Sequence, residues 1–324
     1  MPIAAPRGTQ DILPPESRRW QWLEECFRHH GALYGYREMR TPIFESTELF
    51  ARGVGEETDI VAKQMYSFQS RGGDALTLRP EGTAGVVRAM IQHNLLAQGG
   101  VQKICYFGPM FRYERPQKGR YRQLHQVGVE AFGSPGPAID AETLAFASDF
   151  LAAVGISDAR LELNSVGCPA CRPRYRDALR NALAGARTGL CTDCTRRYDT
   201  NPLRVLDCKV ESCRTVTRDV PVILDMLCAE CRDHLRGVEA GLRALGVPFV
   251  INPHIVRGLD YYTRTAFEFI AGGLGAQNTV LAGGRYDGLV AELGGPATPA
   301  IGFAAGIERL LMAAGEAAPA PPMA

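Results

Sequence analysis

Residues 111–126 have the sequence FRYERPQKGRYRQLHQ, in which five arginines or lysines surround a Pro/Gly turn. The flanking segments, 104–107 and 127–132, are rich in β-branched and aromatic residues, and Pro116 and Gly119 interrupt the run between them. We expect a β-hairpin whose basic tip suits the binding of a polyphosphate. Because side chains alternate along a strand, one face of the sheet should carry Arg112 with Glu114 and, on the second arm, Leu124, Gln126 and Glu130.

A basic hairpin alone is also typical of a solvated sheet edge or of a crude nucleic-acid patch. The overall charge gives no help, because the formal net charge of the 324 residues is only +1 and any phosphate recognition must be local. The hydrophobic content of 46% is enough for one large core or two unequal ones. The sequence holds no signal peptide, transit peptide or membrane-spanning run, so we expect a cytoplasmic protein with no membrane partner.

Periodicity predicts further elements on both sides of the hairpin. Apolar residues recur at helical spacing over 16–34, and a strand ending at Pro42 should follow. Residues 74–80 look extended and a helix starts at Thr83, which places Arg79-Pro80-Glu81-Gly82-Thr83 at a strand-to-helix turn. Later in the chain we expect a helix over 140–154, strands over 249–251 and 261–270, glycine loops over 271–288, and a final helix that opens at Gly302.

Eight of the ten cysteines lie between positions 168 and 231 and form four chelating pairs. Four thiolates can bind one tetrahedral zinc ion, so these pairs could fill two structural zinc sites, and the spacing leaves open which pairs join. Disulfides are the alternative, but cytoplasmic thiols stay reduced. The predicted ligands are Cys168, Cys171, Cys191, Cys194, Cys208, Cys213, Cys228 and Cys231.

Four separated segments have to be explained together: 77–83 (TLRPEGT), the basic hairpin, 256–265 (VRGLDYYTRT) and 302–309 (GFAAGIER). Their order resembles that of the class II aminoacyl-tRNA synthetases. The third segment, together with 282–289 (AGGRYDGL), closely resembles the two signature stretches of the histidyl-tRNA synthetases. The resemblance covers residues 6–312 and includes the opening PRGTQD at 6–11.

The resemblance implies that ATP activates L-histidine and that histidyl-adenylate then reacts with tRNA(His), with Mg²⁺ accompanying ATP. In such a site the substrate carboxylate attacks the α-phosphate of ATP, so anionic repulsion must be screened and both partners held. By resemblance, Arg112 would hold the α-phosphate and Arg257 would stabilise charge that grows in the transition state. Arg309 would stack on adenine, and Glu114 and Arg120 would position the nucleotide.

For histidine, the resemblance assigns the amine side to the turn Glu81, Gly82 and Thr83 and to Gln126. Glu130 and Tyr262 would face the imidazole, and Tyr261 and Tyr286 would line the pocket. A carboxylate opposite the ring would reject apolar isosteres, because they would leave its charge unpaired. One position departs from the family pattern: Leu124 stands where a phenylalanine is expected before His-Gln. Arg309 and aliphatic packing would then have to hold adenine.

The implied fold is α+β, a class II synthetase-like, mostly antiparallel sheet flanked by helices, with an inserted Cys-rich subdomain. We expect the core in two parts, 1–160 and 241–314, the insert at 161–240, and a linker or truncated end at 315–324. The first helix and the strand ending at Pro42 correspond to the segment through which such enzymes form homodimers. Gln117 at the hairpin tip would contact the acceptor stem of the tRNA. A complete enzyme of this kind carries a further C-terminal anticodon-binding domain, which we do not find in these 324 residues.

A rival hypothesis is a non-catalytic paralogue, similar to the regulatory subunit of ATP phosphoribosyltransferase, which senses histidine. Such paralogues typically lose the catalytic arginines, whereas Arg112, Arg257 and Arg309 are all present here. A third alternative is a generic module that binds zinc and nucleic acid. This alternative does not account for the carboxylate side chains on the predicted strands. The sequence therefore favours the enzyme.

Overall fold

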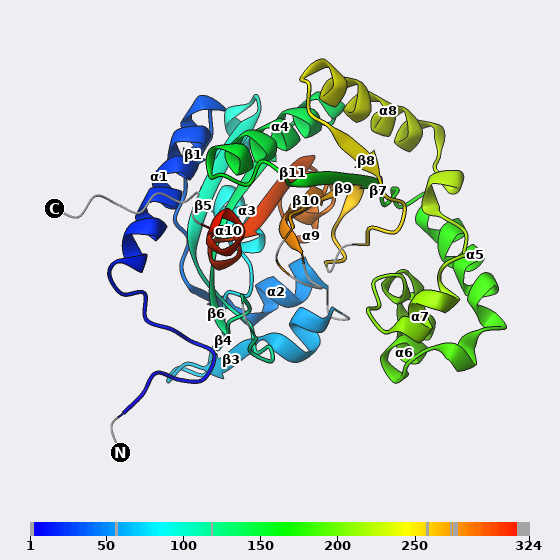
Figure 1. Cartoon of the computed structure of the whole chain (residues 1–324), viewed down its shortest axis with the longest axis horizontal. Coiled ribbons are helices and arrows are strands. Elements are labelled where there is room, and N and C mark those ends of the chain that lie inside the picture. The colour runs from blue at the N-terminus through cyan, green and yellow to red at the C-terminus, as the bar shows by residue number, and fades with distance from the viewer. Residues whose placement is uncertain are drawn as a thin grey trace.

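A computed structural model describes residues 3–55, 58–117, 119–256, 259–272, 274 and 278–315 (Figure 1). The helices are α1 (Glu16–Leu33), α2 (Thr47–Val54), α3 (Thr83–Gln92), α4 (Pro137–Ala153), α5 (Arg172–Ala184), α6 (Thr192–Thr200), α7 (Glu211–Val216), α8 (Ala229–Ala244), α9 (Leu289–Glu292) and α10 (Ile307–Ala314). Short turns of other helix types are η1 (Ile60–Gln64), η2 (Leu95–Gln98), η3 (Arg187–Gly189), η4 (Pro202–Val205) and η5 (Ile223–Met226).

The strands form two sheets. The larger has eight strands in the order β1-β5-β6-β11-β10-β9-β7-β8, and the smaller has the order β2-β4-β3. In the larger sheet only the outermost pairs, β1 with β5 and β7 with β8, are parallel, so the predicted mostly antiparallel sheet is confirmed. The strand bounds are β1 (Arg37–Glu38), β2 (Phe44–Ser46), β3 (Tyr66–Gln69), β4 (Ala75–Leu78), β5 (Gln102–Phe111), β6 (Gln123–Phe132), β7 (Arg160–Ser165), β8 (Phe249–Ile251), β9 (Thr263–Ile270), β10 (Thr279–Arg285) and β11 (Ala300–Gly306).

Helices α1, α4, α8 and α10 cover one face of the large sheet and bury the main core against it (Figure 1). Phe27 of α1, Phe150 of α4 and Phe267 of β9 are fully buried there, and the rings of Phe27 and Phe150 meet edge to face at 5.3 Å. A second apolar cluster lies where α3 and α9 approach the sheet near Tyr106 and Tyr286. Because side chains alternate along each strand, residues between those in the main core point to the opposite face.

The predicted hairpin is formed by β5 and β6, which pair over their full length with the basic segment 112–122 at the tip. The helix predicted over 16–34 is α1, the helix predicted over 140–154 is α4, and the turn at 79–83 joins β4 to α3. The predicted strand ending at Pro42 is wrong in extent, since β1 ends at Glu38 and β2 begins at Phe44. The strand expected from Tyr261 begins two residues later, at Thr263.

Two predictions for the C-terminal part are wrong. We expected a helix to begin at Gly302, but Gly302 lies within strand β11, and helix α10 begins only at Ile307. The glycine loops expected over 271–288 contain strand β10. Both segments are rich in Gly and Ala, and their backbones need that composition to pack closely. A Cβ on Gly283 would lie 2.1 Å from the carbonyl oxygen of Gly302.

The Cys-rich insert, α5 to η5, lies to one side of the sheet (Figure 1). The domain limits given above stay a prediction. The structure adds that β7 and α8, at the two ends of the 161–240 segment, belong to the layers of the core: β7 pairs with β9, and α8 packs in the main cluster with α4. Among the described residues, no helix is long and apolar enough to cross a membrane.

Candidate active site

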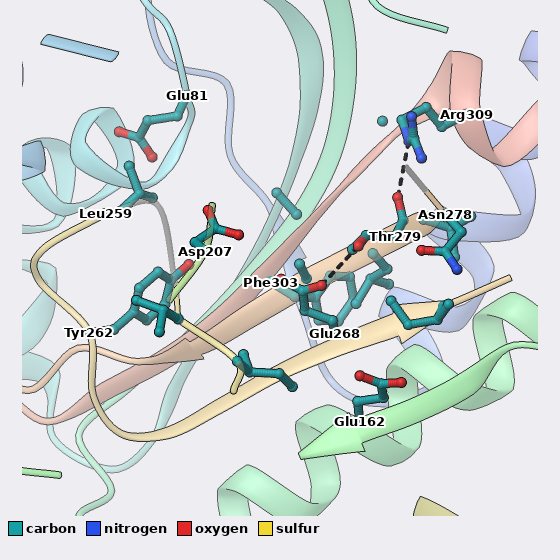
Figure 2. Close-up of a pocket in the computed structure, with 18 of the residues that line it drawn as sticks. Glu81, Glu162, Asp207, Leu259, Tyr262, Glu268, Asn278, Thr279, Phe303 and Arg309 are labelled. Carbon is teal, nitrogen blue, oxygen red and sulfur yellow. Dashed lines mark hydrogen bonds between the residues drawn. The ribbon is translucent and has the colours of Figure 1, made fainter. Parts of the chain in front are cut away.

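A cavity of about 910 Å³ opens on the face of the large sheet opposite the main core. Its walls come from β6, β9, β10 and β11, from the turn before α3, from the hairpin tip, and from the Cys-rich insert. Figure 2 shows Glu81 and Tyr262 toward one end of this cavity and Arg309, Asn278 and Thr279 toward the other. The cavity therefore has a buried end near α3 and a basic end near α10.

Glu130 of β6 is the centre of the buried end. It is 1% exposed, and its carboxylate accepts hydrogen bonds from Thr83 Oγ1 at 2.7 Å, Tyr106 Oη at 3.2 Å and Tyr286 Oη at 2.5 Å. These three donors come from α3, β5 and the turn after β10. Four separate parts of the chain therefore hold one carboxyl group in a fixed orientation.

Glu81 fixes the turn that leads into α3. Its two carboxylate oxygens accept hydrogen bonds from the backbone N–H groups of Thr83 at 2.7 Å and Ala84 at 2.9 Å. These N–H groups lie in the first turn of a helix, where backbone donors lack intrahelical partners. The sequence folds this way because a carboxylate just before the first turn satisfies them.

Glycines make room for these groups. A Cβ on Gly302 would lie 1.9 Å from Oε2 of Glu130, and one on Gly128 would lie 2.4 Å from the ring of Tyr106. A Cβ on Gly82 would meet the same ring at 2.2 Å. Strand β11 needs glycine at 302 because the neighbouring carboxyl group occupies the space above it.

Burial changes the protonation of the buried end. It raises the pKa of Glu130 to about 8, helped by the nearby charge of Glu81 and opposed by the hydrogen bonds from Tyr286, Thr83 and Tyr106. Burial also raises the pKa of Glu81, against the hydrogen bonds from Ala84 and Thr83 and the charge of Arg112. A cationic ligand would stabilise the ionised forms of these two buried carboxyl groups and lower their raised pKa values, so the pair favours a positively charged ligand.

Gln126 adds an acceptor beside these carboxyl groups. Its Oε1 is buried and has no hydrogen-bond partner among the described residues. A buried amide oxygen without a partner is costly, so the position suits a ligand that donates a hydrogen bond. The aromatic wall is formed by Tyr261, whose ring lies 4.7 Å from that of Tyr262 and 5.5 Å from that of Tyr286.

The basic end is formed by the hairpin and α10. Arg112 Nε donates to the carbonyl oxygen of Pro80 at 2.8 Å, and Arg120 pairs with Glu114 at 3.2 Å. Arg309 Nε donates to the carbonyl oxygen of Thr279 at 3.0 Å. Burial lowers the pKa of Arg309, and the positive charge of Arg120 lowers it further. Cations held this close together repel one another, so an anion between them would be stabilised.

Two acidic residues that the sequence did not single out, Glu162 of β7 and Glu268 of β9, also line the cavity. Glu268 accepts a hydrogen bond from Thr279 Oγ1 at 2.8 Å (Figure 2). Glu162 accepts one from Asn252 Nδ2 at 2.6 Å. Tyr106 was also missed. In the paired strands Tyr106 of β5 lies opposite Gly128 of β6, two residues before Glu130, so its contact with that carboxyl group is visible only once the strands are paired.

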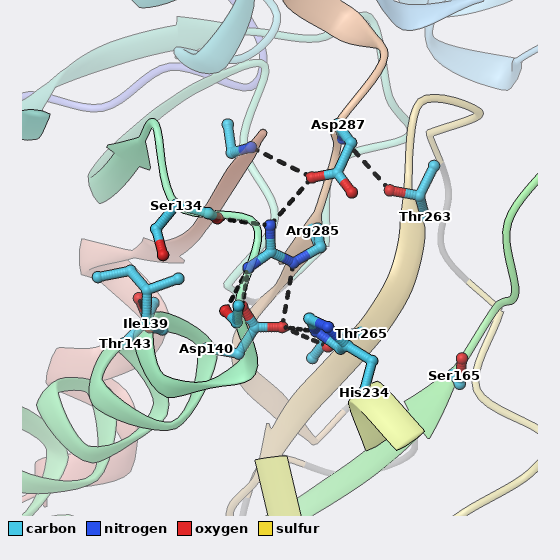
Figure 3. A network of polar contacts seen from close by, with 12 residues as sticks. Ser134, Ile139, Asp140, Thr143, Ser165, His234, Thr263, Thr265, Arg285 and Asp287 are labelled. Carbon is cyan, nitrogen blue, oxygen red and sulfur yellow. Dashed lines mark hydrogen bonds and ion pairs between the residues drawn. The ribbon is translucent and has the colours of Figure 1, made fainter. Parts of the chain in front are cut away.

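A buried ion pair supports the site from behind (Figure 3). Arg285 and Asp140 are both fully buried; Arg285 Nε donates to Asp140 Oδ2 at 3.2 Å, and its Nη2 donates to the other carboxylate oxygen. His234 of α8 and Thr265 of β9 also contact this carboxylate, at 2.7 and 2.5 Å. Burial alone would raise the pKa of Asp140, but the hydrogen bond from His234 and the charge of Arg285 hold it below its usual range. Arg285 directly precedes Tyr286, so this network fixes the backbone that carries one wall of the cavity.

The structure brings together nearly all of the predicted ligand-binding residues. The residues that line the one cavity are Glu81, Gly82, Thr83, Arg112, Glu114, Arg120, Leu124, Gln126, Glu130, Tyr261, Tyr262, Tyr286 and Arg309. Gln117 is exposed at the hairpin tip and does not line it. Arg257 lies outside the described residues. The individual roles stay predictions.

The eight cysteines of the insert form two groups of four: Cys168, Cys171, Cys228 and Cys231, and Cys191, Cys194, Cys208 and Cys213. All ten cysteines are free thiols. Each group offers four sulfur atoms within 4.8 Å of one another, an arrangement that could hold a metal ion. Cys105 is buried and Cys26 half-buried, and both pack in the main core, as expected.

Known proteins resemble this chain over nearly its whole length. The sequence model of the family described as histidyl-tRNA synthetase matches residues 8–310. The histidine–tRNA ligase of Moorella thermoacetica is 55% identical over 313 residues, which are 97% of this chain and 74% of that protein. The apo histidyl-tRNA synthetase of S. aureus is 42% identical, with a TM-score of 0.78 over 96% of this chain and 73% of that one.

A more distant structure shares the fold alone. It is described as an ATP phosphoribosyltransferase regulatory subunit/histidyl-tRNA synthetase from Bacillus halodurans, and it is 22% identical with a TM-score of 0.71 over 97% of this chain and 84% of that one. The two proteins at higher identity described above are named as a histidine–tRNA ligase and a histidyl-tRNA synthetase.

Proposed function

The chain belongs to the histidyl-tRNA synthetase family, and from this premise we propose that it activates L-histidine with ATP and transfers the histidyl group to tRNA(His). The observation that carries the proposal is the single cavity that joins two buried carboxyl groups at one end to three arginines at the other. A cationic amino acid fits the first end and a triphosphate fits the second.

The reaction needs no side-chain nucleophile, because a carboxylate oxygen of histidine attacks the α-phosphorus directly. The bond to the β-phosphate then breaks, and pyrophosphate leaves as histidyl-adenylate forms. The enzyme has to hold the two anions in line and stabilise the negative charge that develops on the oxygens of the α-phosphate. Arg112 is the proposed α-phosphate ligand, and its hydrogen bond to Pro80 keeps it beside the histidine-binding turn. Arg309 and Arg120 would meet the remainder of the nucleotide. Arg257 is proposed as the second cation at the α-phosphate.

Recognition of histidine is proposed to depend on the buried end. The α-ammonium group would donate to Glu81, Thr83 and Gln126, and the unpartnered Oε1 of Gln126 supports that placement. Glu130, held by Tyr286 and Thr83, would face the imidazole with Tyr262. A buried carboxyl group of this kind excludes apolar side chains of similar size, because they leave it without a partner.

Several further assignments belong to the same proposal. Mg²⁺ would accompany the triphosphate, since this ion is usually held through phosphates and water. Gln117, exposed at the hairpin tip, would contact the acceptor stem of tRNA(His). Zinc is the proposed metal of the two cysteine groups, and a cytoplasmic location agrees with their reduced thiols.

A homodimer is proposed through α1 and the segment that follows it. Ile43 and Phe44, just after this segment, are 45% and 49% exposed, which is unusual for large apolar side chains that lie next to each other. Sedimentation velocity should give twice the mass of the chain.

The direct test is aminoacylation of tRNA(His) with labelled histidine. We expect histidine to be attached only when ATP is present, and the Arg112→Ala variant to be strongly impaired. The rival, a histidine-sensing paralogue, predicts that histidine binds without ATP consumption and that a phosphoribosyltransferase co-purifies with the chain.

A further inference from the structure

The distances between cysteine sulfur atoms match a metal site and exclude disulfides. Sγ of Cys168 lies 3.7 Å from that of Cys171 and 3.9 Å from that of Cys228, and Sγ of Cys191 lies 3.8 Å from that of Cys208. A disulfide needs about 2.05 Å. Four thiolates at about 2.3 Å from a tetrahedral zinc ion lie roughly 3.8 Å apart. Both groups therefore have the dimensions of a tetrathiolate site.

The backbone around the sulfur atoms also suits thiolates. The N–H of Cys228 donates to Sγ of Cys171, and the N–H of Cys191 donates to Sγ of Cys213, each at 3.1 Å. Hydrogen bonds of this kind, from backbone N–H groups to sulfur, stabilise the negative charge of a metal-bound thiolate. A donor set of four sulfurs in tetrahedral arrangement favours zinc over harder ions.

The two groups are nested along the chain. The neck group, defined as Cys168, Cys171, Cys228 and Cys231, joins the first pair to the last. It lies where α5 and α8 begin, and Cys171 and Cys231 are buried in the main core. Further along α8, His234 contacts the buried Asp140. The neck group thus closes the base of the insert onto the elements that support the cavity.

The tip group, defined as Cys191, Cys194, Cys208 and Cys213, lies between the two neck pairs in sequence. Three of its cysteines belong to a small apolar cluster separate from the main core. Ion pairs connect the region around this cluster to the rest of the protein: the guanidinium groups of Arg197 and Arg204 lie 2.7 and 3.3 Å from the carboxylate of Asp59.

The tip group also touches the candidate active site. Asp207, Cys208 and Lys209 line the cavity, together with Arg214 and Arg218 from the segment that follows. A metal ion bound to Cys208 would therefore fix one wall of that cavity. A small cluster of this size gains much of its folding energy from such an ion.

We propose that the chain binds two zinc ions with different tasks. The neck ion holds the insert on the core, and the tip ion holds the cavity wall formed by residues 207–218 in place. The second task rests on the proposed function, because it concerns the cavity in which adenylation would occur. Zinc binding and its pairing are independent of that function.

The pairing is tested by counting zinc in purified protein by elemental analysis. Wild type should contain two ions per chain. A variant with all four tip cysteines changed to serine should keep one ion, because nesting leaves the neck group complete. If the pairs instead joined in sequence order or alternately, the same variant would lose both ions. The control is Cys26→Ser. Cys26 lies outside both groups, so this variant should keep two zinc ions per chain.

A second measurement on wild type covers the case in which the variant fails to fold. With zinc bound, the eight clustered cysteines should resist a thiol reagent under native conditions, and a chelator should expose them. Eight reactive thiols in the native protein, or fewer than two metal ions per chain, would overturn the proposal. Two iron ions in place of zinc would overturn the choice of metal.

The task of the tip ion is tested by histidine-dependent pyrophosphate exchange. The tip variant should lose roughly 10- to 100-fold in kcat/KM, since a displaced cavity wall misplaces the substrates. Unchanged kcat/KM with one zinc ion lost would refute the task assigned to the tip ion. Absence of exchange in wild type that contains two zinc ions would instead refute the proposed function and leave both sites standing.

Discussion

The hydroxyl of Tyr286 donates a hydrogen bond to Glu130 across 2.5 Å, and both side chains are almost fully buried. Tyr286 directly follows Arg285, whose guanidinium is paired with Asp140 behind the sheet. The orientation of the carboxyl group in the cavity therefore depends on an ion pair that no ligand can reach.

Glu130→Gln should change how stability depends on pH. The pKa of Glu130 is raised from 4.5 to about 8, so between these values the native state binds a proton that the unfolded state has lost. Stability must then fall as pH rises through this window. The glutamine cannot ionise, so this part of the fall should vanish. Urea unfolding across the window measures it, with Glu48→Gln, whose side chain is 72% exposed, as the control. Equal pH dependence in wild type and Glu130→Gln would contradict the prediction.

Arg285→Met should destabilise the protein by about 3–5 kcal/mol, because it leaves the buried Asp140 without its main charge partner. The matched control is Arg236→Met, which breaks a pair whose two side chains are each 70% exposed and should cost at most about 1 kcal/mol. Chemical denaturation of the three proteins gives the values. Similar losses for both variants would mean that the buried network has no special role.

Gly302→Ala should damage both stability and histidine binding. The new Cβ would lie 1.9 Å from Glu130 Oε2 and 2.3 Å from the carbonyl oxygen of Val129, so strand or carboxyl group must move. We expect a loss of about 1–3 kcal/mol and a raised KM for histidine. Gly185→Ala has nothing within 4 Å of its Cβ and should behave as wild type. A Gly302→Ala protein with normal stability and normal KM would count against the described position of Glu130.

Removal of single arginines tests the phosphate-binding end. Arg112→Ala and Arg257→Ala should each lower histidine-dependent adenylation by roughly 10²- to 10³-fold, the usual loss for one preorganised donor. Arg115→Ala is the control, because this arginine lies in the same hairpin tip but is exposed and does not line the cavity. Equal activity of all three variants would show that neither Arg112 nor Arg257 contributes to adenylation.

Local patterns in the sequence predicted the parts of the site that depend on one strand or one turn. The alternation along 123–132 correctly placed Leu124, Gln126 and Glu130 on the cavity face, and the breaks at 79–83 correctly placed Glu81 before a helix. The resemblance to a known family added the link between these segments, which no local pattern contains.

Contacts between distant residues could not be predicted. His234 and Arg285 lie 94 and 145 positions from Asp140, and no periodicity relates them. The cysteine spacing predicted metal ligation but not which pairs join, since Cys168 meets Cys228 across 60 positions. Strand β11 was mistaken for the start of a helix because its alanines favour helices, whereas the need for Gly302 beside Glu130 appears only once the strands are paired.

The central claim is that this cavity activates histidine, and ATP–pyrophosphate exchange measures it most directly. With wild-type protein, labelled pyrophosphate should enter ATP when L-histidine is present, and no other standard amino acid should replace it. A folded protein that binds histidine but catalyses no exchange would contradict the account and support the histidine-sensing paralogue.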